Sequence, residues 1–271
     1  MNAETKIKNK VSLMCILVLS LGLTLMASDS EALTTVDVQN VVKKTADKVL
    51  SYPEMPDYKV SATSTMHEMD KNWKSKKKTV VEKTIMMKNK IRSESIKSAV
   101  EIQKGKTKDV TQKFVNDAYK AREKAARERK KAKDEDGEDD EHRRRMDISL
   151  EEMLPFSEKN RENYEFALLE ESTWQGTPVY VLEARAKQRT KDFFEGEFYI
   201  AKETFDIHRA ELQLAKNPGP LKLMEMAVDF QVLPEGFLVL KKMSFRIHVG
   251  LVVKNIRREG TEEYFDYQFL E

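Results

Sequence analysis

The sequence predicts an α+β protein built on one large, curved antiparallel sheet, and three observations lead to this fold class. One amphipathic helix follows the N-terminal segment, runs of alternating apolar and polar residues fill most of the remaining chain, and short turns join these runs. Alternation with a period of two is typical of strands that bury one face. Strands joined by short turns pair in the antiparallel sense, because parallel neighbours need long crossover connections.

The opening helix is expected over residues 36–51. Its apolar residues recur at helical spacing, and Tyr52-Pro53 ends the pattern. The residues of this stripe are Val38, Val41, Val42, Ala46, Val49 and Leu50. A stripe of this kind needs a partner surface, so we expect the helix to cover part of the sheet.

The alternating runs lie on both sides of a segment of very high charge. The expected strands cover residues 58–66, 80–87, 91–102, 164–174, 179–187, 196–202, 205–216, 223–233, 237–249 and 252–270. Between them, residues 117–145 begin as a helix, continue in an acidic cluster and end in Arg143-Arg144-Arg145. Such a block buries too little apolar surface to offset its ordering entropy, so we expect a solvated insertion. A membrane-surface or partner-docking arm is the alternative, which the mixed signs of charge weaken.

The first 32 residues have the layout of a secretory signal peptide. A basic start is followed by an uncharged apolar run over residues 11–27 and by small residues at Ser30 and Ala32. We expect cleavage after Ala32 and export, and an uncleaved N-terminal anchor is the alternative. The only cysteine, Cys15, lies in this segment, so the mature domain, residues 33–271, has no cysteine.

Composition and motifs exclude several classes of function. The 48 Lys and Arg residues nearly balance the 46 Asp and Glu residues, so a nucleic-acid partner is not expected. The histidines have no metal-ligand spacing, and no phosphate-binding glycine loop, nucleophile elbow or zinc-protease motif occurs. Adjacent carboxylates such as Glu262-Glu263 face opposite ways on a strand and are interpreted as solvated charge. We therefore expect no cofactor, no metal and no enzyme, with an exported enzyme of unseen mechanism as a remaining hypothesis.

One face of the expected sheet is apolar in strand after strand. The helical cover that the sequence offers is the helix at residues 36–51 and a short segment near 150–156, which Ser149 and Glu152 begin with a capping box. This is little helix for so wide a sheet, so we expect uncovered apolar surface that binds a ligand or a partner. An ordinary core is the alternative for any single residue. The candidate apolar ligand-binding residues are Tyr180, Leu182, Phe198, Ile200, Met224, Met226, Val228, Phe230, Phe245 and Ile247.

Three segments resemble parts of the outer-membrane lipoprotein-sorting proteins. Residues 199–211, YIAKETFDIHRAE, are similar to a hairpin of that family in which an acidic-Thr turn joins two strands. Residues 229–240 and 263–267 resemble the last strands of the family. With the exported leader and the opening helix, their order resembles the LolA-like carriers and the related RseB-like sensors. The resemblance is best over residues 164–271 and weaker over 58–102.

This resemblance implies a fold and a function. It implies a strongly curved antiparallel sheet, an unclosed β-barrel, with helices covering the concave apolar face. The implied function is that of a monomeric periplasmic carrier or chaperone that binds lipoprotein acyl chains or another apolar cargo in lipoprotein sorting, with a possible membrane-protein partner. An envelope-stress sensor or regulatory lipid-binding module is the alternative. The charged insertion is a departure from the compact carriers, and no residue here is assigned as the family's functional arginine.

Overall fold

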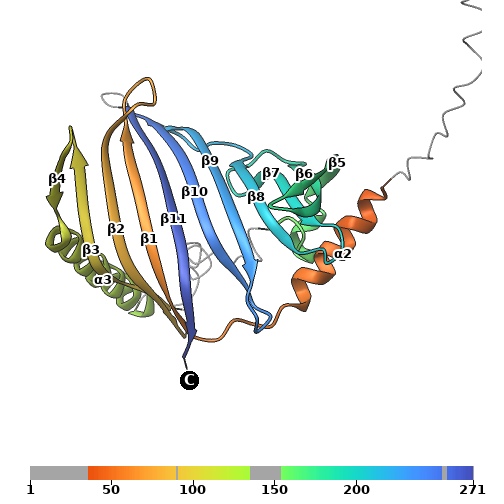
Figure 1. The fold of residues 1–271 in the computed structure, drawn as a ribbon, viewed down its shortest axis with the longest axis horizontal. Coiled ribbons are helices and arrows are strands. Elements are labelled where there is room, and N and C mark those ends of the chain that lie inside the picture. Colours follow the sequence, from red (N-terminus) through yellow and green to blue (C-terminus); the bar gives the residue numbers. More distant parts are fainter. Residues whose placement is uncertain (1–35, 90, 135–153, 252–254, 271) are drawn as a thin grey trace, which may run out of the picture. The chain divides into compact units, whose positions relative to one another are not determined.

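The computed structural model describes residues 36–89, 91–134, 154–251 and 255–270 (Figure 1). The chain divides into two units, residues 1–36 and 37–271. Only Val36 of the first unit is described, and the second unit contains the described helices and strands.

Several sequence predictions lie outside these residues. They are the signal peptide, the acidic cluster with the arginines that follow it, and the capping box at Ser149 and Glu152.

Eleven strands form one sheet in the order β4-β3-β2-β1-β11-β10-β9-β8-β7-β6-β5, and every neighbouring pair is antiparallel. The first and last strands therefore pair in the middle of the sheet (Figure 1). The strands are β1 (Tyr58–Met69), β2 (Ser75–Lys88), β3 (Ile91–Gln103), β4 (Lys106–Asp109), β5 (Tyr164–Trp174), β6 (Thr177–Ala186), β7 (Phe194–Ala201), β8 (Ile207–Leu214), β9 (Leu221–Val232), β10 (Leu238–Gly250) and β11 (Asn255–Phe269).

The expected open antiparallel sheet is confirmed, and its curvature is smaller than expected. The edge strands β4 and β5 each pair with one neighbour, and the sheet is not strongly curled. The described part of the chain is mostly β, with two long helices. Strand β4 was not expected, because its sequence KTKD has no apolar residue to alternate.

Helix α2 (Val38–Ser51) forms where the apolar stripe predicts it. The Asp37 side chain accepts hydrogen bonds from the backbone N–H groups of Gln39 and Asn40, which satisfies donors of the first turn. The buried residues of the helix are Val41, Val42, Thr45, Ala46 and Val49, of which all but Thr45 belong to the predicted stripe. The inclusion of Leu50 in the stripe is wrong, since that side chain is 66% exposed.

The turn between β7 and β8 holds the end of helix α2. The Tyr52 hydroxyl donates a hydrogen bond to Asp206, and Lys48 Nζ lies 3.4 Å from the same carboxylate. Burial opposes ionisation of Asp206, but hydrogen bonds from Thr204 and Tyr52 and the charge of Lys48 outweigh it and lower the pKa of that carboxyl. Burial and the carboxylate of Asp206 raise the pKa of Tyr52.

Helix α3 (Thr111–Asp134) contains the helix expected at the start of the charged insertion, and its first turn belongs to the core. Val110 and the partly buried Phe114 pack with Val81 and Ala99 of the sheet. The Thr111 hydroxyl accepts a hydrogen bond from the backbone N–H of Ala99 at 2.9 Å. The charged helix is therefore anchored to β3 by residues that precede the insertion.

Strand register sorts the side chains onto two faces of the sheet. We call the side that carries Leu182, Phe198 and Val228 the apolar face, and the side that carries Glu183 and Glu197 the polar face. Direct cross-strand pairs and alternation within each strand place all the candidate ligand-binding residues on the apolar face. The pairs are Tyr180 with Ile200, Leu182 with Phe198, Met224 with Ile247, and Met226 with Phe245.

Candidate functional site

The candidate apolar residues separate into a buried group and a partly exposed group. Leu182, Phe198 and Ile200 are fully buried, and Val228 and Phe230 are nearly so. The Phe156 ring meets the Phe198 ring edge-on at 5.1 Å. Of the helical cover expected near residues 150–156, the described residues 154–156 form a turn and not a helix, and Phe156 covers the apolar face there. The short helix α6 (Glu158–Arg161) follows. The partly exposed group contains Tyr180, Met224, Met226, Phe245 and Ile247.

Four members of the second group form a central apolar patch, which we define as Met224, Met226, Phe245 and Ile247. They lie on the neighbouring central strands β9 and β10 as two direct pairs. The Phe245 ring lies across β11, because a Cβ built at Gly260 would meet that ring at 2.5 Å. The long described helices pack mainly near the two edges of the sheet, α3 against β3 and α2 against β5. The patch therefore lies away from the main helical contacts of the described chain.

Charged side chains interrupt the apolar face on β2, β3 and β11. Lys83 Nζ lies 2.9 Å from Glu262 and 3.1 Å from Glu94, and Arg92 lies 2.7 Å from Glu94 and 3.5 Å from Glu262. Lys83 and Glu262 are 9% and 7% exposed, so the interpretation of Glu262 as solvated charge is wrong. Burial opposes ionisation of Glu94, but hydrogen bonds and charge from Arg92 and Lys83 outweigh it and lower the pKa of that carboxyl. We call these four residues the buried ionic network after its buried pair, Lys83 and Glu262, whereas Arg92 is exposed.

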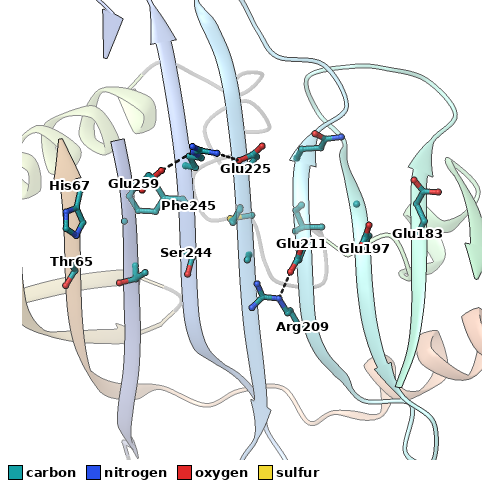
Figure 2. Close-up of a pocket in the computed structure, with 18 residues that line it drawn as sticks. Thr65, His67, Glu183, Glu197, Arg209, Glu211, Glu225, Ser244, Phe245 and Glu259 are labelled. Carbon is teal, nitrogen blue, oxygen red and sulfur yellow. Dashed lines mark hydrogen bonds and ion pairs between the residues drawn. The ribbon is translucent and has the colours of Figure 1, made fainter. Parts of the chain in front are cut away.

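A hollow of about 700 Å³ lies over the polar face and is lined by residues of β1 and β6 to β11 (Figure 2). A row of directly opposed residues crosses these seven strands, and every member lines the hollow. In order across the sheet, this transverse row is Glu183, Glu197, Glu211, Ala227, Ser244, Thr261 and Thr65. One half of the row is acidic, and the other half has only short side chains.

Longer side chains flank the transverse row on one side. Arg246 in the neighbouring row lies between Glu225 and Glu259, at 3.7 Å and 3.0 Å from their carboxylate oxygens. Its guanidinium stacks on the Trp73 ring at 4.0 Å from the centroid. Trp73 belongs to the turn between β1 and β2, where the Asp70 side chain accepts a hydrogen bond from the backbone N–H of Lys74.

Arg209 repeats this arrangement on the other side of the row. Its guanidinium lies 2.8 Å from Glu211 and 2.6 Å from Asp229, and it stacks on the Trp174 ring at 4.8 Å. Both tryptophans of the chain therefore contact an arginine that lines the hollow.

The hollow has an excess of negative charge. Five glutamates and two arginines line it, which gives a net charge of −3 with His67 neutral. Glu197 lies directly opposite both Glu183 and Glu211 (Figure 2). Glu183 has Arg185 at 2.7 Å and Glu211 has Arg209, whereas no ion pair with Glu197 is found among the described residues.

Sequence reasoning missed this hollow because each strand contributes only one or two of its residues. The alternation does place Glu183, Glu197 and Glu211 at polar positions, but their alignment depends on the register between strands. Among the residues that the structure describes, no group of three His, Cys, Asp or Glu side chains could hold a metal ion. No described helix has the length and apolar character needed to cross a membrane.

The fold and the two faces define a class of protein: an open, mostly β sheet with an apolar patch on one side and a charged hollow on the other. The chain belongs to a family of unknown function, DUF5686, whose family model matches residues 44–267. No curated protein matches the chain.

Solved structures show a distant likeness to the LolA superfamily. A LolA superfamily protein from Nitrosomonas europaea is 11% identical, with 86% of this chain and 94% of that chain covered and a TM-score of 0.37. An outer-membrane lipoprotein-sorting protein domain from Vibrio parahaemolyticus is 10% identical, with 87% and 95% covered and a TM-score of 0.38. The MucA/MucB complex of Pseudomonas aeruginosa gives 9% identity, 84% and 94% coverage and a TM-score of 0.26. These likenesses are too distant to identify any residue of either face.

Proposed function

We propose that this protein is a carrier that binds an acyl chain, of a lipoprotein or another lipid, over the central apolar patch. The observation that supports this proposal is the partly exposed patch itself, which lies at the middle of the sheet while the long described helices pack near its edges. An acyl chain gains about 0.8 kcal/mol for each methylene that it buries, so binding needs no charged contact. The flexible thioethers of Met224 and Met226 adapt to apolar ligands of varied shape.

The surroundings of the patch favour an apolar ligand over an ionic one. On the β11 side, Met243 lies directly opposite Glu262 of the buried ionic network. That network contains two cations and two carboxylates in mutual contact. The network is neutral as a whole, so it leaves no net charge that would attract the ionic headgroup of a ligand.

The proposal extends to place and partner. The expected signal peptide would bring a monomeric chain to the periplasm, where a membrane-protein partner would exchange the cargo during lipoprotein sorting. A carrier releases its cargo to such a partner, whereas a sensor stays in a stable complex with a membrane regulator. Pull-down from envelope extracts, with mass spectrometry of the eluted lipids and proteins, distinguishes these two outcomes.

The direct test is titration of the folded protein with a fluorescent acyl probe. Met224→Asn and Met226→Asn place an amide without a hydrogen-bond partner against the acyl chain, which costs about 1–3 kcal/mol, or roughly 5- to 150-fold in affinity. The matched control is Leu223→Asn, because Leu223 is the neighbour of Met224 on the opposite face of the same strand. Circular dichroism must first show that every variant is folded. A folded wild-type protein that binds no acyl probe contradicts the proposal.

A further inference from the structure

We propose that the hollow on the polar face is a docking site for an extended basic segment of a partner protein, with a Lys or Arg side chain placed on Glu197. This inference goes beyond the proposed acyl binding, because it concerns the opposite face of the sheet and a different chemistry. It rests on the shape of the transverse row, on the charge around it, and on the way its arginines are held.

The transverse row has the dimensions of an extended peptide. It crosses seven strands, and neighbouring strands lie about 4.8 Å apart, so the row is roughly 29 Å long. An extended segment of about nine residues covers that length. The short side chains of Ala227, Ser244 and Thr261 let a peptide backbone approach the sheet, while Glu225 and Arg246 on one side and Arg209 on the other rise beside it.

The charge of the hollow calls for a cation at one end of the row. The whole chain has a net charge of +2, whereas the lining of the hollow carries −3. Each of the two arginines that line the hollow already contacts two carboxylates, so neither arginine neutralises the charge of Glu197. Like charges that face each other across strands repel, and a cationic side chain on Glu197 would relieve repulsion from both of its neighbours.

The two arginines are held away from Glu197 by their own contacts. Arg246 lies over the Trp73 ring and within 3.0 Å and 3.7 Å of the carboxylates of Glu259 and Glu225, and its buried Nε has no well-aligned hydrogen-bond acceptor among the described residues. Arg209 is fixed in the same way by Trp174, Glu211 and Asp229. A guanidinium that lies over an aromatic ring and is attracted to carboxylates on both sides has restricted freedom to turn toward a further carboxylate. The negative charge at Glu197 is therefore available to a ligand without rearrangement of the hollow.

A basic peptide fits these features better than other ligands. Sugars commonly stack on open aromatic rings, but each tryptophan ring here is stacked with a guanidinium on one face. A small amine would satisfy the acidic end and leave the half with Ala227, Ser244 and Thr261 unused. An extended segment with one basic residue at the glutamate end and small polar residues beyond it uses both halves.

The test measures binding of labelled nine-residue peptides to the full mature chain by fluorescence anisotropy at low salt. The basic peptide has one Lys at one end and Ser and Thr at the other positions. In the neutral peptide, Gln replaces this Lys. We expect the basic peptide to bind about tenfold more tightly than the neutral one, as one charge-assisted contact implies. Glu197→Gln should remove most of this difference, and added salt should weaken the wild-type complex.

The matched control is Glu263→Gln, which removes the same charge from the same face at a residue that does not line the hollow. We expect its affinity for the basic peptide to stay within about twofold of the wild type, since Glu263 is already paired with Lys242 and makes no contact with a peptide on the transverse row. Equal losses in the two variants would overturn the proposal, because they indicate unspecific attraction. Spermidine binding as tightly as the peptide, or no binding to the folded wild type, would also overturn it. Met226 and Phe245 also line the hollow, so the acyl titration of Met224→Asn, whose residue does not line it, is the separate test of the apolar face.

Discussion

The two faces of the sheet differ in how their charges are matched. On the apolar face, Lys83 and Arg92 contact Glu94 and Glu262, so two cations meet two carboxylates in a cluster whose Lys83 and Glu262 are buried. On the polar face, five glutamates share a hollow with two arginines. Burial makes an unmatched charge very costly, whereas an open hollow tolerates one because water solvates it. An unmatched charge therefore persists only on the face that a charged ligand can reach.

The largest expected effect comes from breaking the matched cluster. Lys83→Met leaves Glu94 and Glu262 facing each other with one cation fewer, and we expect the free energy of unfolding to fall by about 3–5 kcal/mol. Lys242→Met is the control on the polar face, where Lys242 pairs with the exposed Glu263 at 2.9 Å, and its cost should stay below about 1 kcal/mol. Urea titration of both variants gives the comparison.

A double variant sharpens this prediction. Lys83→Met combined with Glu262→Met removes one cation and one carboxylate, so the remaining pair of Arg92 and Glu94 is again neutral. We expect it to recover much of the stability lost in Lys83→Met, because apolar residues of similar volume often replace a buried ion pair without loss. Additive losses in the double variant would show that the network is solvated, and the contrast between the faces would disappear.

A partly buried carboxylate gives an intermediate case. Asp206 accepts a hydrogen bond from Tyr52 and lies near Lys48, and its pKa is lowered. Asp206→Asn should reduce the free energy of unfolding by about 1–2 kcal/mol near pH 7, since a charge-assisted contact is weakened. A lowered pKa stabilises the fold above the ordinary Asp pKa of about 4, and this gain is lost as the pH falls through the lowered value.

Unfolding of wild type and Asp206→Asn at several pH values tests this sign. The difference between them should be constant from about pH 5 to 7 and shrink below about pH 4. A difference that grows on acidification would mean that Asp206 does not hold helix α2 through its ionised form.

The sequence predicts the secondary structure well and the two sites unevenly, for a physical reason. Alternation within a strand is local, so it correctly puts Met224, Met226 and Phe245 on one face. Burial depends on what packs above each residue, and nothing local distinguishes the buried Phe198, which contacts Phe156, from the partly exposed Phe245. Ionic contacts such as Lys83 with Glu262 join residues far apart in the chain. Their presence on the apolar face could not be predicted from the pattern of either strand alone.

The smallest expected effect on the free energy of unfolding concerns Glu197. No ion pair with this glutamate of the hollow is found among the described residues. The sign of the change is more informative than its size. Most substitutions destabilise a fold, but Glu197→Gln removes a charge that lies directly opposite Glu183 and Glu211. We expect the free energy of unfolding to rise by about 0.2–1 kcal/mol at low salt, because cross-strand like charges cost about that much. The gain should shrink as salt is added, since exposed charges are screened. Glu263→Gln loses its contact with Lys242 and should show no gain. A destabilised Glu197→Gln variant would mean that the protein itself already stabilises this carboxylate, and the hollow would then hold no unmatched charge to attract a basic partner.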